Sequence, residues 1–209
     1  MGKLRDYFSV MGTAFLFWRR APKLTDSGAL AAFCLQRASY VAQTTLYGYL
    51  RTRAGLQHFN LFTDKKFTAL LKPARTRLVL VCLDDLAIYA AALVPQASKP
   101  QRETLAAEIF AHGVVHLADE LPADELQKAR QDFEAHSHLI DWAARAAPDK
   151  GVAAFRKSAE ALIELAPIVE ALKKYDDEIV TNSMHFKWHG VRAQLRERLD
   201  GDALLASLT

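Results

Sequence analysis

The chain has 209 residues, of which 51% are hydrophobic and 24% are charged, a balance typical of globular proteins that argues against disordered and fibrous classes. It contains only two cysteines, Cys34 and Cys82, so no disulfide framework is needed and a reducing cytoplasmic compartment is the simpler expectation. The net charge of +3 conceals an asymmetry, because residues 1–77 hold 13 basic and 3 acidic residues while the remainder holds 14 basic and 21 acidic ones. A basic N-terminal third indicates an anionic partner or a solvated basic surface.

Apolar residues recur at spacings of three and four almost throughout, without the sustained alternation of half-buried strands. The pattern predicts an all-α fold, a single bundle of about six to eight helices. We expect an amphipathic N-terminal segment over residues 1–23, followed by a helical bundle domain over residues 24–209.

The N-terminal segment Leu4–Trp18 is rich in aromatic residues and has basic flanks. Its apolar run is shorter than the about 20 residues of a membrane span, and basic residues stand where a signal peptide has its cleavage site. These features favour a helix that lies in a membrane interface or docks on a partner, with packing into the bundle core as the alternative. The residues expected to make the contact are Lys3, Arg5, Phe15, Trp18, Arg19, Arg20 and Lys23.

Capping residues, prolines and glycines mark where the later helices begin and end. They predict one helix that starts at Pro122 and others over residues 28–53, 64–72, 73–94, 98–118, 149–172 and 180–199. Pro73 is expected to open the helix of residues 73–94, and Pro167 to bend the helix of residues 149–172, whose apolar stripe includes Val169 and Leu172.

Two adjacent aspartates, Asp84 and Asp85, interrupt a helix that is otherwise apolar nearly all round between residues 74 and 94. Such a helix is predicted to be central and buried. Successive residues differ by about 100° in direction, so at least one carboxylate must face packed surroundings and be paired, ligated or protonated. The short connection to the next helix predicts an antiparallel hairpin, in which the aspartates lie level with His112.

His112 and His116 have i, i+4 spacing on the helix predicted over residues 98–118, and they lie at the edge of its apolar face. We interpret the aspartates first as part of a hydrogen-bonded lock that fixes helix register, with His112 or Tyr89 as the partner. The alternatives are a divalent metal site, an acid/base site or the polar end of a small-ligand pocket. The candidate catalytic residues are Asp84, Asp85, His112 and His116, and the candidate metal ligands are Asp84, Asp85, Glu108, His112 and His116.

A second histidine pair, His185 and His189, shares one helix side with Arg192 and Arg196. Two neighbouring guanidinium groups oppose a divalent cation. We therefore interpret this side as a basic binding surface for an anion, or as a solvated helix face.

The chain contains no nucleophile elbow, phosphate-binding glycine loop, dinucleotide fingerprint, HExxH or CxxC motif. The sequence therefore favours a non-enzymatic interaction protein (adaptor, scaffold or assembly factor) that docks through its basic N-terminal third on a partner protein or on an anionic membrane surface, peripherally at the inner face. The alternative is a metal-dependent or acid/base enzyme, or a small-ligand-binding bundle, centred on the Asp/Glu/His cluster. No cofactor is expected beyond the divalent metal of that alternative, and a second copy of the chain and nucleic acid are further candidate partners.

Overall fold

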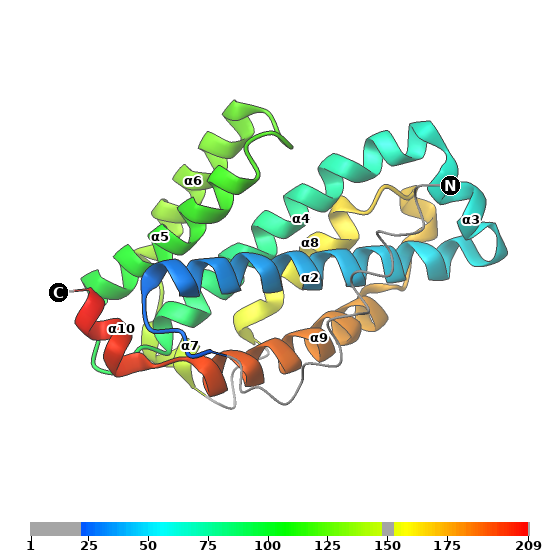
Figure 1. Cartoon of the computed structure of the whole chain (residues 1–209). Coiled ribbons are helices and arrows are strands. Elements are labelled where there is room, and N and C mark those ends of the chain that lie inside the picture. The colour runs from blue at the N-terminus through cyan, green and yellow to red at the C-terminus, as the bar shows by residue number, and fades with distance from the viewer. Residues whose placement is uncertain (1–21, 148–152, 209) are drawn as a thin grey trace.

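The computed structural model describes residues 22–147 and 153–208, and these form α-helices (Figure 1). The all-α bundle predicted from the periodicity is confirmed. Within these ranges β pairing is limited to an isolated bridge between Leu24 and Leu199. Six residues with a predicted docking role lie outside the described ranges, and that role stays a prediction for Lys3, Arg5, Phe15, Trp18, Arg19 and Arg20.

The described helices are α2 Ser27–Ala54, α3 His58–Thr63, α4 Lys65–Ala92, α5 Lys99–His116, α6 Ala123–Ser137, α7 Trp142–Ala146, α8 Arg156–Leu165, α9 Asp177–Arg198 and α10 Gly201–Ser207. Short 3-10 turns occur at Gly55–Gln57 (η2), Ala153–Phe155 (η3) and Glu170–Leu172 (η4). Predicted caps hold several helix starts: Asp26 accepts a hydrogen bond from the backbone of Ala29, and Ser98 and Gln101 form a reciprocal capping box. Within the described ranges, no helix has both the length and the apolar character needed to cross a membrane.

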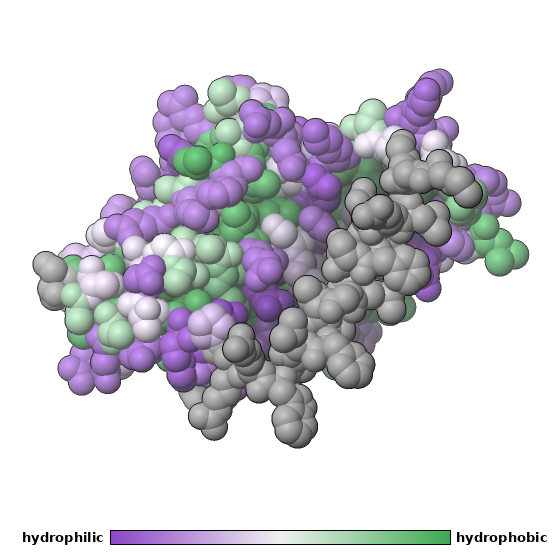
Figure 2. All heavy atoms as spheres, in the orientation of Figure 1, coloured by the Kyte–Doolittle hydropathy of each residue, from purple (hydrophilic) through white to green (hydrophobic). Residues whose placement is uncertain are grey.

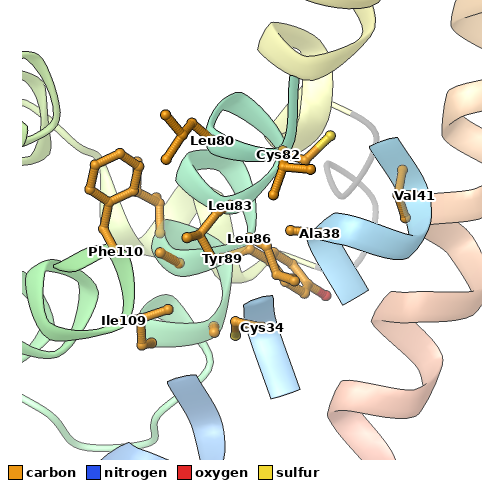
Figure 3. Close-up of a cluster of buried hydrophobic side chains, with 14 of the residues drawn as sticks. Cys34, Ala38, Val41, Leu80, Cys82, Leu83, Leu86, Tyr89, Ile109 and Phe110 are labelled. Carbon is orange, nitrogen blue, oxygen red and sulfur yellow. The ribbon is translucent and has the colours of Figure 1, made fainter. Parts of the chain in front are cut away.

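Helix α4 is the central element, as its all-round apolar sequence predicts. Nearly every residue from Leu78 to Ala92 is buried, and α2, α5 and α8 all pack against it. Figure 3 shows Leu83 of α4 among side chains that include Ala38 of α2 and Ile109 of α5. A helix covered on several sides has no exposed stripe for polar residues, so polar groups along it must find partners inside the protein.

Both cysteines lie in this core as free thiols, so the expectation of no disulfide is confirmed for them. Burial raises the pKa of Cys34 and Cys82, because the ionised thiolate would lose its hydration. They pack as small apolar side chains.

The helix boundary predicted at Pro73 is wrong. Helix α4 runs unbroken from Lys65 to Ala92 with Pro73 inside it. A proline inside a helix removes one backbone hydrogen bond and crowds the preceding turn, at a cost of about 3 kcal/mol or more. The burial of Leu71 just before the proline, and the packing of the long apolar helix that follows, offset that cost.

Pro167 ends a helix instead of bending it. Helix α8 ends at Leu165, and the next residue, Ala166, has an extended backbone with φ −61° and ψ 125°. This conformation is the one that a following proline favours. Val169 and Leu172, which were expected in the apolar core stripe, are exposed.

The hairpin of α4 and α5 brings Leu83 against Gly113. A Cβ atom added to Gly113 would lie 2.1 Å from Cδ2 of Leu83, which is fully buried. Gly113 is adjacent to His112 in the chain, so the depth predicted for the aspartate pair is confirmed.

We expect Gly113→Ala to lower the free energy of unfolding by about 1–3 kcal/mol relative to Gly190→Ala, because the added methyl group overpacks the core. Both glycines lie inside helices, so both variants gain the roughly 1 kcal/mol helix propensity of alanine. A Cβ atom at Gly190 would have no neighbouring atom within 4 Å, which makes it the matched control. Urea denaturation measures both, and equal effects would contradict the close approach at Leu83.

Candidate functional site

Asp84 joins the central helix to α6 and α8. Its carboxylate accepts a hydrogen bond from Nζ of Lys157 at 2.5 Å, and Nε2 of His136 lies 3.0 Å from its other oxygen. The Asp84 side chain is only 7% exposed, so these two groups supply the counter-charge that a buried carboxylate requires. The hydrogen bond to Asp84 raises the pKa of His136, since it favours the protonated imidazole.

Asp85 is bonded differently. One of its carboxylate oxygens accepts a hydrogen bond from the backbone N–H of Ser158, the third residue of α8, at 2.8 Å. Phe155, which precedes α8, provides no side-chain cap, so Asp85 caps this helix from across the core. Burial, followed by repulsion from the adjacent Asp84, raises the pKa of Asp85 to about 7, although the Ser158 hydrogen bond acts in the opposite direction.

The start of α8 is also held from its other side. Nε1 of Trp188 in α9 donates a hydrogen bond to Oγ of Ser158 at 3.0 Å, and that hydroxyl donates to the carbonyl of Phe155 at 3.0 Å. The Phe155 ring stacks on Trp188, with 4.3 Å between ring centroids. The N-terminus of α8 is therefore fixed between α4 and α9.

A pocket of about 480 Å³ opens beside the two aspartates. Four elements contribute its walls, which are Asp84, Asp85 and Ile88 of α4, His136 of α6, Arg145 of α7, and Arg156, Lys157 and Glu160 of α8. The residues from α4 are buried, whereas those from α8 are exposed. The two buried aspartates therefore lie at the inner end of the pocket, and the exposed Arg156, Lys157 and Glu160 give its mouth charges of both signs.

The expected contact between the aspartates and His112 is wrong. At this depth Leu83 faces α5, and Asp84 and Asp85 point toward α6 and α8 instead. The rings of His112 and His116 lie against each other, with 4.2 Å between centroids. Burial, and secondly the neighbouring His116, lower the pKa of His112.

The expected metal set therefore does not come together. Within residues 22–147 and 153–208, no three His, Cys, Asp or Glu side chains are arranged to hold a metal ion. This applies to the predicted set Asp84, Asp85, Glu108, His112 and His116.

The basic side of α9 is partly used for packing. The guanidinium groups of Arg192 and Arg196 lie 5.7 and 5.9 Å from the ring centroid of the buried Tyr89. His185 is half-buried, which lowers its pKa, whereas His189 is exposed. Anion binding by this surface stays a prediction.

Lys23 is the one residue of the predicted N-terminal docking set that lies within the described ranges. Its Nζ donates a hydrogen bond to the carbonyl of Glu197 at 2.7 Å, near the end of α9. The neighbouring backbone is tied to the same helix end, where the N–H of Leu24 donates to the carbonyl of Arg198 at 2.8 Å. In this structure Lys23 attaches the start of the described chain to α9.

A second candidate site is the tip formed by residues 51–72, which comprise the end of α2, α3 and the start of α4. We call it the α2–α4 tip. Leu56 is 98% exposed and Phe59 is 72% exposed, and Figure 2 shows hydrophobic atoms at the end of the molecule where Figure 1 places α3. The tip contains one acid, Asp64, and five basic residues, which are Arg51, Arg53, Lys65, Lys66 and Lys72.

The α2–α4 tip is an ordered structure. The ring of Phe62 in α3 stacks on Tyr47 of α2 at 5.5 Å and meets Phe67 of α4 edge-on at 6.1 Å. A groove of about 760 Å³ lies beside this aromatic contact, and Arg51 and His58 are among its lining residues. These contacts of Phe62 attach α3 to α2 and α4, while Phe59 of the same helix and Leu56 of η2 are exposed to solvent.

Comparison of the chain with protein-family models, curated proteins and solved structures finds no match, so the geometry of these two sites carries the functional argument.

Proposed function

We propose that the protein is a non-enzymatic interaction protein that docks through the α2–α4 tip on an anionic membrane surface, peripherally at the cytoplasmic face. The observation that carries this proposal is the exposure of Leu56 and Phe59 at the end of the bundle, among five basic residues and one acidic residue. Of the five basic residues, Arg53 is neutralised by an ion pair with Asp176, so the other four supply the positive charge. Large apolar side chains grouped on a surface mark contact sites. Each such side chain contributes roughly 1.5–3 kcal/mol when it leaves water, and each cation contributes about 1 kcal/mol near an anionic leaflet.

The shape and charge of the tip favour a membrane over a protein partner. Leu56 of η2 and Phe59 of α3 are both largely exposed at the end of the bundle, which suits insertion between lipid headgroups. Arg51 and His58 line the groove beside them, where a headgroup phosphate would find a guanidinium group. The N-terminal segment of residues 1–23 is proposed as a second contact of the same kind.

The test is co-sedimentation of the full chain with vesicles of neutral phosphatidylcholine, with and without anionic phosphatidylserine. We expect binding to the anionic vesicles at low salt and weaker binding at high salt, because screening reduces the attraction of the cations. The double variant Leu56→Asp, Phe59→Asp should bind at least about tenfold more weakly, since it loses both apolar anchors.

The matched control is Leu139→Asp, which changes another exposed leucine, beyond the end of α6. It should bind as the parent does. Equal binding by the tip variant would exclude the tip as the contact, and no binding by the parent to anionic vesicles would reject the membrane function altogether. A parent protein that ignores vesicles but captures an acidic protein through Leu56 and Phe59 would also overturn the membrane proposal.

A further inference from the structure

The two aspartates differ in how their charges are balanced. Asp84 has the ammonium group of Lys157 and the imidazole of His136 within ion-pair distance. Asp85 is just as deeply buried, yet within the described ranges it forms no ion pair of its own, and its hydrogen-bond partner is the neutral backbone N–H of Ser158. The ammonium group of Lys157, which pairs with Asp84, is the smallest of the influences on the pKa of Asp85. A buried carboxylate without a counter-ion is strongly disfavoured unless a cation reaches it.

The helix cap alone does not require this charge. An asparagine at position 85 could offer the same N–H an amide oxygen, without the desolvation of a carboxylate. The aspartate therefore costs stability at this position whenever it is ionised. Such a cost is typical of groups that are held ready for a ligand or for chemistry.

The pocket beside Asp85 has a complementary charge at its mouth. The exposed Arg156 of α8 and the half-buried Arg145 of α7 both line it. Arg156 also contacts Glu160, with Nε 3.0 Å from the carboxylate, but both side chains are largely exposed and such surface pairs contribute little. The guanidinium group of Arg156 can therefore turn to a ligand carboxylate at small cost.

We propose that this pocket binds a small zwitterionic amino-carboxylate, whose ammonium group pairs with Asp85 and whose carboxylate pairs with Arg156 at the mouth. The volume of about 480 Å³ lies within the roughly 300–1,000 Å³ of small-molecule pockets. The ammonium group supplies the direct ion pair that Asp85 does not form with Lys157, and the buried Ile88 provides an apolar wall for the carbon chain between the two charges. This site is separate from the α2–α4 tip, so the proposal does not depend on membrane docking.

Proton binding to Asp85 should compete with the ligand. The charged and titratable groups around Asp85 are Cys82 and Asp84 on α4, His136 on α6, Arg145 on α7, and Arg156, Lys157 and Glu160 on α8. With the pKa of Asp85 raised to about 7, the carboxylate is largely protonated in weak acid. Affinity should therefore fall about tenfold per pH unit below that value.

The test is isothermal titration calorimetry of the full chain at about pH 8, where Asp85, with its pKa of about 7, is ionised. The probes are glycine, β-alanine and γ-aminobutyrate, which differ in the distance between their two charges. Propylamine and propionate, which carry one charge each, are the controls. We expect saturable binding of at least one amino-carboxylate, and at least about tenfold weaker binding of both controls because each forms only one of the two charged contacts.

Asp85→Asn should weaken the binding at least about tenfold, whereas Asp119→Asn, which changes an exposed aspartate outside the pocket, should leave it unchanged. Three results would overturn the proposal: no binding by any amino-carboxylate, equally tight binding of propionate, or binding that Asp85→Asn leaves intact. The pH dependence of the parent's affinity is a test that needs no variant, and an affinity that stays constant between about pH 8 and about pH 5 would also overturn it.

Discussion

Asp85→Asn is expected to stabilise the protein above about pH 7 by up to about 4 kcal/mol. The pKa of Asp85 is about 7 in the folded protein, compared with about 3.9 in an unfolded chain. Between these values the folded protein holds a proton that the unfolded chain has released, so the free energy of unfolding falls as the pH rises. Asparagine has no proton to lose here, and its amide oxygen can still accept the hydrogen bond from Ser158.

Urea denaturation of the parent and the variant at about pH 5 and about pH 8 measures this effect. The raised pKa of His136 acts in the same direction, because its stabilising interaction with Asp84 is also lost as the pH rises. The free energy of unfolding of the variant should therefore still fall slightly between about pH 5 and about pH 8. In the control Asp119→Asn, the free energy of unfolding should change with pH as much as in the parent. An equal change with pH in Asp85→Asn and in the parent would contradict the assignment of this pH dependence to Asp85.

The sequence predicted the depth of the aspartate pair along the helix correctly, but not the direction in which the two side chains point from the helix axis. A short connection between two helices fixes equal depths on both sides of the turn, which is why Leu83 meets Gly113 beside His112. The direction of each side chain depends on which side of α4 faces α5. Because α4 is apolar nearly all round, its pattern has no preferred side from which to predict this.

The actual partners of the pair come from a distant part of the chain. Lys157 and Ser158 lie 73 residues after the aspartates that they contact, on a helix connected through several intervening elements. The lengths of the connecting loops do not determine how two helices so far apart in the sequence pack against each other. His136 offered a usable signal, because it stands three residues after the buried Phe133 and so shares its side of α6.

The basic N-terminal third was visible in the composition, whereas the α2–α4 tip required the structure. Leu56 and Phe59 are three residues apart, a spacing that the sequence pattern cannot separate from a buried helix face. In the structure α3 packs Phe62 against Tyr47 and leaves Phe59 exposed, and Leu56 is exposed in the preceding turn η2. At Pro73 the local sequence predicted a helix start that the structure does not have. The packing of α4 overrides this local signal, and the helix continues through the proline.

Trp188→Ala is expected to lower the free energy of unfolding by about 3–5 kcal/mol, the second large effect that the structure predicts. The side chain is 1% exposed, stacks on Phe155 and donates a hydrogen bond to Ser158. Trp188→Phe keeps an aromatic ring in the stack but removes the indole N–H, so it should cost about 1–3 kcal/mol. Phe186→Ala, which changes an exposed aromatic residue of the same helix, is the control and should stay within about 0.5 kcal/mol of the parent.

Urea denaturation gives the three stabilities, and amide hydrogen exchange at Ser158 shows where the loss acts. Trp188 and Asp85 hold the same residue from opposite sides, through its hydroxyl and its backbone N–H respectively. Loss of the indole N–H should therefore speed exchange at Ser158 more than in the core of α4, because local opening at the start of α8 becomes easier. If Trp188→Phe matched Phe186→Ala in both measurements, the Trp188 to Ser158 hydrogen bond would not contribute to holding the wall of the pocket in place.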